Sequence, residues 1–87
     1  MNGIWIHSQD RKTLVYAKRI AIERFKEHEN NRYLYRIINQ VLYQDNADDY
    51  DVLGVYTTEK RAIEILGDIS RSIDGLINKS NKVFYMP

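Results

Sequence analysis

Few side chains in this sequence have the types and spacing that catalysis requires. The two histidines, His7 and His28, are separated by a predicted strand and a turn, and neither lies in a His-Glu-x-x-His pattern. The absence of cysteine excludes disulfides, thiolate zinc sites and cysteine nucleophiles. There is no Gly-x-Ser-x-Gly elbow and no glycine-rich phosphate loop. We therefore expect a protein that is not an enzyme, with no catalytic residue and no cofactor.

The acidic segment 45–51 is the best candidate for binding a divalent cation, because carboxylate oxygens in a loop suit Ca²⁺ and Mg²⁺. Its spacing differs from that of an EF-hand, which needs glycine at the sixth position and a carboxylate at the twelfth. The sequence has Tyr50 and Tyr56 at these positions. The segment is therefore predicted to be a solvated loop, and whether it binds a cation stays open.

Positive charge and aromatic rings are combined most densely between residues 16 and 36. Basic residues alternate there with rings, a mixture that single-stranded nucleic acids favour for phosphate contacts and base stacking. The segment matches no RNP consensus, and alternating rings on a strand also pack against helices. The candidate surface for nucleic acid or a partner comprises Lys18, Arg19, Arg24, Arg32, Tyr33, Tyr35 and Arg36.

The aromatic content also suits protein binding. Seven tyrosines and one tryptophan are many for 87 residues, and tyrosine, tryptophan and arginine concentrate the binding energy of protein interfaces. A chain this short buries roughly 60% of its surface on folding, so self-association would add useful apolar burial. We expect a protein-interaction or self-associating module, with a homodimer as one form, and keep single-stranded nucleic-acid binding through residues 16–36 as the alternative.

Charge is segregated along the sequence although the net charge is only +1. Residues 11–36 contain eight basic and three acidic side chains, whereas residues 45–74 contain eight acidic and three basic ones. The two halves are predicted to face each other in the fold and to cancel locally. Opposed charged faces would also suit a symmetric dimer.

Several short runs of β-preferring residues predict the strands that carry these side chains: 4–8, 13–25, the runs 33–38 and 41–43 together, 52–56 and 83–86. Polar stretches at 8–12, 27–31 and 45–51 predict turns or loops between them, and the strands flanking 27–31 should pair. The segment 14–25 also has apolar residues at helical spacing, so a helix stays open there, but its alternation favours a strand. Gly54 predicts a bulge or close packing.

A helix is predicted over residues 58–77. Thr57 or Thr58 supplies an N-cap hydroxyl, and Glu59 places a favourable charge in the first turn. The predicted apolar face comprises Ala62, Leu66, Ile69, Ile73, Leu76 and Ile77. The opposite side carries Glu64, Gly67, Asp68, Arg71 and Asp74. This pattern is typical of a helix packed on a sheet.

The predicted order is β-β-β-β-α-β, and residues 1–87 are expected to form a single small domain. Its fold class is α+β: a mostly antiparallel sheet of four to five strands with one amphipathic helix packed on one face. The hydrophobic fraction of 44% and charged fraction of 29% are ordinary for globular proteins. Neither a signal peptide nor a stretch of about 20 apolar residues is seen, so we expect a cytoplasmic protein without membrane association.

The sequence resembles a group of short bacterial proteins from Gram-positive species and their phages, for which no activity is established. The resemblance rests on Trp5-Ile6, Ser8-Gln9-Asp10, Leu53-Gly54, Tyr56, Thr58, Arg61-Ala62, Leu66, Ile69, Val83 and Tyr85-Met86-Pro87. It implies a strand-rich domain in which residues 8–10 form the first turn and residues 58–69 open the helix, and it favours a strand at 14–25. It implies no functional residue.

Overall fold

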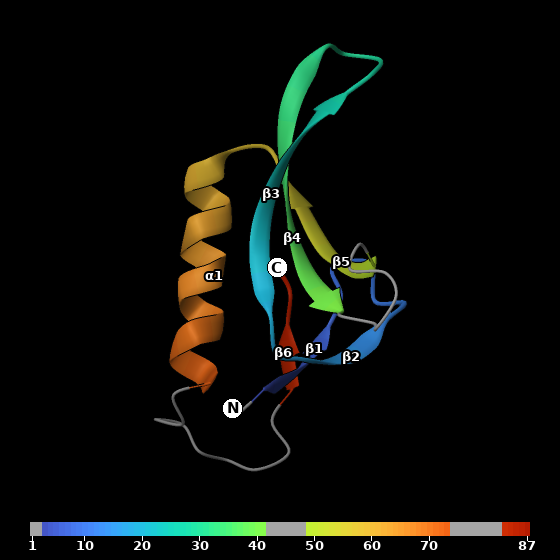
Figure 1. Ribbon diagram of the computed structural model, residues 1–87. Helices are drawn as coiled ribbons and strands as arrows, with labels where there is room; N and C mark the ends of the chain where they lie inside the picture. The colour runs from blue at the N-terminus through green and yellow to red at the C-terminus, as the bar shows by residue number, and fades with distance from the viewer. Residues whose placement is uncertain (1–2, 42–48, 74–82) are drawn as a thin grey trace.

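The computed structural model describes residues 3–41, 49–73 and 83–87. Within these ranges six strands and one helix follow one another along the chain. They are β1 (Ile4–His7), β2 (Leu14–Ala17), β3 (Ile20–Glu27), β4 (Arg32–Val41), β5 (Asp49–Tyr56), α1 (Glu59–Ile73) and β6 (Val83–Tyr85). The first sheet has the strand order β2-β1-β6 and the second sheet has the order β3-β4-β5. Figure 1 shows α1 lying along the second sheet, with the strands of the first sheet at the end where the helix finishes.

The predicted α+β class is confirmed, but the predicted single sheet of four to five strands is wrong. The segment predicted as one strand, 13–25, is interrupted at Lys18 and Arg19 and contributes β2 to one sheet and β3 to the other. At the interruption, the Lys18 N–H donates to Asn39 Oδ1 (3.2 Å) and the Arg19 carbonyl accepts from the Gln40 N–H (2.7 Å). These bonds to β4 satisfy backbone groups of the corner, so the chain can leave the first sheet and enter the second. A helix at 14–25 is excluded.

The first sheet contains both antiparallel and parallel pairing. Strand β1 pairs antiparallel with β2, joining Trp5 to Tyr16, and parallel with β6, joining His7 to Tyr85. The parallel pair brings together segments from opposite ends of the sequence, and local patterns contain no signal for it. The turn predicted at 8–12 is confirmed between β1 and β2.

The second sheet is a three-stranded antiparallel sheet in which β3 and β4 pair as predicted. Their turn spans residues 28–31 and ends at Asn31, whose φ of 52° is a left-handed conformation that asparagine tolerates. The β-type runs 33–38 and 41–43 belong to one strand as far as the structure describes them, because β4 runs without interruption from Arg32 to Val41. Residues 42 and 43 lie outside the described residues.

Strand β5 begins earlier than predicted. The loop expected at 45–51 is wrong for residues 49–51, which pair with β4, and residues 45–48 lie outside the described residues. Asp51 fits into the strand because its Oδ2 accepts a hydrogen bond from Asn39 Nδ2 (3.2 Å). The bulge predicted at Gly54 is confirmed: Ile37 pairs with Gly54 and Ile38 with Val52, so that Leu53 is the additional residue.

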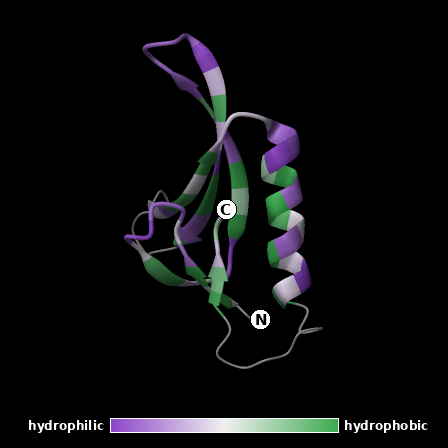
Figure 2. Cartoon of the chain, turned by 180° about the vertical axis from the view of Figure 1, so that it is seen from behind, coloured by the Kyte–Doolittle hydropathy of each residue, from purple (hydrophilic) through white to green (hydrophobic). Residues whose placement is uncertain are grey.

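Helix α1 begins as predicted, with Thr58 as its N-cap: the Arg61 N–H donates to Thr58 Oγ1 (3.1 Å). Ala62 and Ile69 are buried as predicted, but Ile65 is fully buried whereas Leu66 is only half-buried. The side that faces the sheets is therefore rotated slightly from the predicted face, and in Figure 2 hydrophobic positions line that side. The predicted turn of helix at 74–77 lies outside the described residues.

One hydrophobic core connects the helix to both sheets. Its largest fully buried side chains come from β1, β4, β5, α1 and the residue after β6: Ile6, Ile37, Leu53, Ile65, Ile69 and Met86. The core therefore fixes the first sheet against the second. Among the residues that the structure describes, no helix is long and apolar enough to cross a membrane.

Candidate functional site

The outward side of the first sheet carries exposed rings. Because Ile4 and Ile6 enter the core, the alternate residues of β1 and their partners on β2 and β6 point away from it. We define this surface as the aromatic face, formed by Trp5, His7, Leu14, Tyr16 and Tyr85. The exposed fractions are 45% for Trp5, 45% for Tyr16, 52% for Leu14 and 58% for Tyr85, so large apolar surfaces remain open to solvent.

Contacts between neighbouring strands fix the rings of the aromatic face. The centroids of Trp5 and Tyr16 are 5.3 Å apart with tilted planes, and those of His7 and Tyr85 are 5.2 Å apart in a stacked arrangement. The hydroxyl oxygen of Tyr16 also accepts a hydrogen bond from the Gly3 N–H (3.1 Å). The rings are therefore preorganised before any ligand arrives.

Positive charges border this face at both ends of β2. The Arg11 guanidinium lies 5.3 Å from the centroid of Tyr85, and its Nη1 donates to the Ser8 carbonyl (3.3 Å) and the Met86 carbonyl (3.2 Å). At the other end, Lys18 Nζ lies 5.9 Å from the centroid of Tyr16. None of the described strands β1, β2 and β6 contains an acidic residue.

Ion pairing separates these cations from four of the other basic residues. In the ranges that the structure describes, the ion pairs use Arg32, Arg36, Arg61 and Arg71. None of them involves Arg11, Lys12, Lys18 or Arg19, the basic residues that flank β2. Among the described residues, these cations at the border of the aromatic face therefore lie outside the ion pairs, with the Asp10 carboxylate in the same turn as Arg11 and Lys12.

The structure distributes the seven residues predicted to form a binding surface over more than one face of the molecule. Lys18 and Arg19 lie at the corner between β2 and β3, where Lys18 reaches the edge of the aromatic face. Arg24 pairs with Tyr35 and lies 4.4 Å from the centroid of Tyr33, on the side of the second sheet that packs against the core. The remaining two residues, Arg32 and Arg36, occupy the opposite side of that sheet.

The charges of Arg32 and Arg36 are compensated within the second sheet. Arg32 Nε lies 2.8 Å from Glu27 Oε1, and Arg36 Nη2 lies 2.6 Å from Glu23 Oε1. Arg36 also lies over two rings, 4.6 Å from the centroid of Phe25 and 5.1 Å from that of Tyr50. These contacts tie neighbouring strands together and leave Arg36 less available to a ligand.

The Ser8-Gln9-Asp10 turn contains polar groups, but they bind one another. Ser8 is buried, and its hydroxyl donates to Asp10 Oδ1 (2.6 Å), which also accepts from the Lys12 N–H (3.0 Å). The Ser8 hydroxyl and the Lys12 N–H stabilise the carboxylate and hold the pKa of Asp10 below its ordinary value. The Thr13 N–H donates to Ser8 Oγ (3.1 Å), so the turn is a structural feature.

Gln9 connects this turn to β5 and to the end of the described chain. Its N–H donates to the Leu53 carbonyl (2.7 Å), its Oε1 accepts from the Val55 N–H (2.9 Å), and its Nε2 donates to the Pro87 main-chain oxygen (3.0 Å). Tyr56 Oη donates to the same oxygen (3.0 Å), and burial raises the pKa of Tyr56. Gln9, Leu53, Val55, Tyr56 and Pro87 thus meet in one hydrogen-bonded cluster.

Sequence reasoning missed most of the aromatic face. The alternation of Ile4-Trp5-Ile6-His7 contained the signal that Trp5 and His7 point away from the core. Tyr85 could not be added from local patterns, because its place beside His7 depends on the parallel pairing of β1 with β6. In the described ranges no group of three or more metal-ligating side chains gathers.

No family model, curated protein or solved structure matches this chain. The function of this protein is therefore inferred from the geometry and charge of the surface formed by the described residues.

Proposed function

We propose that this chain is a non-catalytic domain that binds single-stranded nucleic acid on the aromatic face. The observation that carries this proposal is a set of exposed rings on one sheet, bordered by cations outside the ion pairs of the described residues. Unpaired bases stack on such rings, and each stacked base contributes about 1–3 kcal/mol as measured by alanine substitution. A cytoplasmic location is part of the proposal.

The cations support nucleic acid over an uncharged ligand. Arg11 and Lys18 lie at opposite ends of β2, which spans roughly 13 Å at about 3.3 Å per residue. Phosphates on either side of the stacked bases would be attracted to these charges. Sheet platforms of this kind stack two or three bases, and the length of β2 suits such a short segment.

The single tryptophan provides a direct test, because Trp5 lies on the proposed binding surface. Single-stranded oligonucleotides should quench its fluorescence, and double-stranded ones of the same composition should bind more weakly. The logarithm of the affinity should fall with the logarithm of salt concentration by about 0.7 for each phosphate neutralised. Unchanged Trp5 fluorescence at low salt, together with no change in oligonucleotide anisotropy, would contradict the proposal.

A second candidate function, protein binding or self-association, is favoured by the outward side of the second sheet. Tyr50, Val52 and Val55 are 39%, 40% and 38% exposed there, on the side away from the core-facing Ile37. Covering these side chains with a partner or a second copy would remove apolar surface from water. Sedimentation of the wild type and of Val52→Lys tests the homodimer: a concentration-dependent increase in mass should be lost in the variant.

A further inference from the structure

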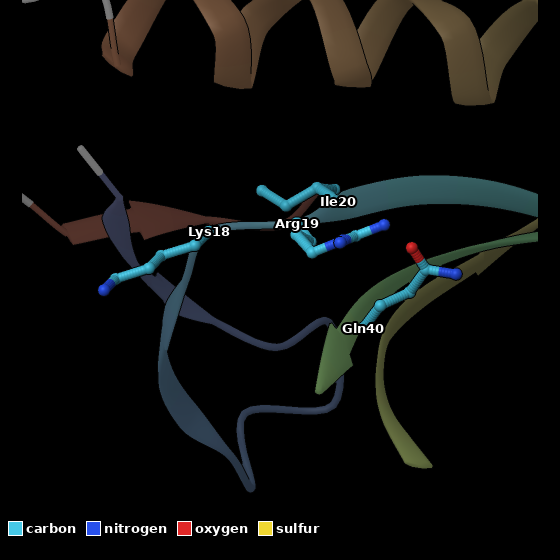
Figure 3. Close-up of a pocket in the computed structure, with 4 residues that line it drawn as sticks. All are labelled: Lys18, Arg19, Ile20 and Gln40. Atoms are coloured by element: carbon cyan, nitrogen blue, oxygen red, sulfur yellow. The ribbon is translucent and has the colours of Figure 1, made fainter. Parts of the chain in front are cut away.

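A hollow of about 520 Å³ opens at the corner between β2 and β3, lined by Lys18, Arg19, Ile20 and Gln40 (Figure 3). Lys18, Arg19 and Gln40 are exposed and Ile20 is half-buried, so the hollow is open to solvent and has one apolar wall. The side chains of Lys18 and Arg19 point in opposite directions, and Arg19 extends toward the side where Gln40 lies.

The backbone beneath this hollow is held by β4. Asn39, only 6% exposed, accepts a hydrogen bond from the Lys18 N–H and donates one to Asp51. The neighbouring Gln40 N–H donates to the Arg19 carbonyl. The two cations therefore extend from a fixed corner, which reduces the conformational entropy that a ligand must remove on binding.

The chemistry of the lining favours an anion. Lys18 and Arg19 carry positive charge, the Gln40 amide has N–H donors, and none of the described residues that line the hollow is acidic. The planar fork of an arginine can donate two parallel hydrogen bonds to phosphate oxygens. The Ile20 side chain offers an apolar contact for the sugar or base next to that phosphate.

The hollow adjoins the aromatic face, because Lys18 lines it while its ammonium group lies over the Tyr16 ring. We infer that Arg19 and Gln40 at this corner bind a backbone phosphate of the strand whose bases stack on the aromatic face, while Lys18, which points the other way, stays over the Tyr16 ring. This inference rests on the proposed function. The sugar-phosphate backbone of the bound nucleic acid would then pass from the aromatic face over the corner between β2 and β3.

The test compares Arg19→Gln with Arg24→Gln, which removes the same charge from the β3–β4 hairpin. Binding of a short oligothymidylate to each full-length variant is measured by Trp5 fluorescence over a range of salt concentrations. Arg19→Gln should reduce the salt slope by about 0.7, the value for one phosphate on a single strand. Arg24→Gln should keep the wild-type slope. Equal slopes for Arg19→Gln and the wild type would overturn the inference and leave the proposed function intact.

A second measurement addresses the hollow independently of base stacking. Nuclear magnetic resonance of the ¹⁵N-labelled wild type, titrated with thymidine monophosphate and then with thymidine, follows the side-chain amide of Gln40. Shifts caused by the monophosphate and not by the nucleoside support a phosphate site. If the wild type binds no oligothymidylate, the proposed function fails, and an unshifted Gln40 amide in this titration then overturns the inference as well.

Discussion

In the second sheet, Arg32 and Arg36 contact Glu27 and Glu23 across the β3–β4 pair, whereas in the first sheet Arg11 and Lys18 border aromatic rings. Basic and aromatic side chains lie close together at both sheets, yet only in the second sheet does the strand register place a carboxylate beside each arginine, Glu27 beside Arg32 and Glu23 beside Arg36. Positive charge in a sequence therefore indicates a binding surface only after its partners in the fold are known.

The two sheets also differ in how they expose their rings. Phe25 and Tyr50 of the second sheet lie next to the Arg36 guanidinium, which occupies part of their surface. Trp5 and Tyr16 of the first sheet are both 45% exposed and lie side by side. Among these rings, the pair in the first sheet has more surface free for a flat ligand.

The largest expected effects test whether the two sheets behave as one folding unit. Ile6 of the first sheet and Ile37 of the second are both fully buried in the shared core. Ile6→Ala and Ile37→Ala should each reduce the free energy of unfolding by about 2–5 kcal/mol. Urea transitions followed by Trp5 fluorescence and by far-ultraviolet circular dichroism should coincide in both variants. Separate transitions would show that the first sheet unfolds independently.

The next effect distinguishes the ligand-binding roles of the two sheets. Tyr85→Ala should weaken binding of a single-stranded oligonucleotide by about 1–3 kcal/mol, a factor of five to more than a hundred. Tyr33, which is 48% exposed on the β3–β4 hairpin, provides the matched control, and Tyr33→Ala should keep the wild-type affinity. Fluorescence titration measures both variants, and equal losses would contradict the assignment of binding to the first sheet.

A smaller effect tests the hydrogen bonds that connect the turn after β1 to the second sheet. Gln9→Ala removes two side-chain hydrogen bonds, to the Val55 N–H and the Pro87 oxygen, and should cost about 1–3 kcal/mol. The Val55 amide should exchange with solvent faster than in the wild type. Gln40→Ala, at an exposed position, should change stability by less than about 0.5 kcal/mol. Slow exchange at Val55 in Gln9→Ala would show that Gln9 does not protect β5.

The smallest effects concern the pH dependence of stability and involve one carboxylate near each sheet, Asp10 and Glu27. The Ser8 hydroxyl and the Lys12 N–H lower the pKa of Asp10, and the Asn30 amide and Arg32 lower the pKa of Glu27. Each carboxylate therefore adds stability that is complete above its unfolded-state pKa and is lost as pH falls through its lower folded pKa, below about pH 4. Asp10→Asn and Glu27→Gln should lose stability at neutral pH and approach the wild type in acid. Urea midpoints measured against pH test this, and a pH-independent difference would contradict it.

Features with a local cause were predictable from the sequence. The Thr58 cap needs only a hydroxyl before the helix, and the Gly54 bulge follows from a residue without a side chain in a β-rich run. The β3–β4 hairpin follows from a polar turn between two β-type segments. In each case the deciding residues are close together in the sequence.

Features decided by distant residues were not predictable in this way. The chain turns at Lys18–Arg19 where Asn39 and Gln40 bind its backbone, and the local pattern of 13–25 continues through that point. The aromatic face was missed for a related reason, because Tyr85 joins His7 only through strand pairing across the whole described chain. Among the predicted candidate residues, Lys18 alone is seen to reach a ring of that face.

The parallel pairing of β1 with β6 has a consequence for synthesis of the protein. The β3–β4 hairpin and α1 are built from segments close in sequence, so they can begin to form while later residues are still being translated. Strand β1 must wait for residues 83–85 before its second neighbour exists. A nascent chain on the ribosome would therefore expose Trp5 before the His7–Tyr85 pair can stack. The protein would become able to bind its ligand only after β6 has paired with β1.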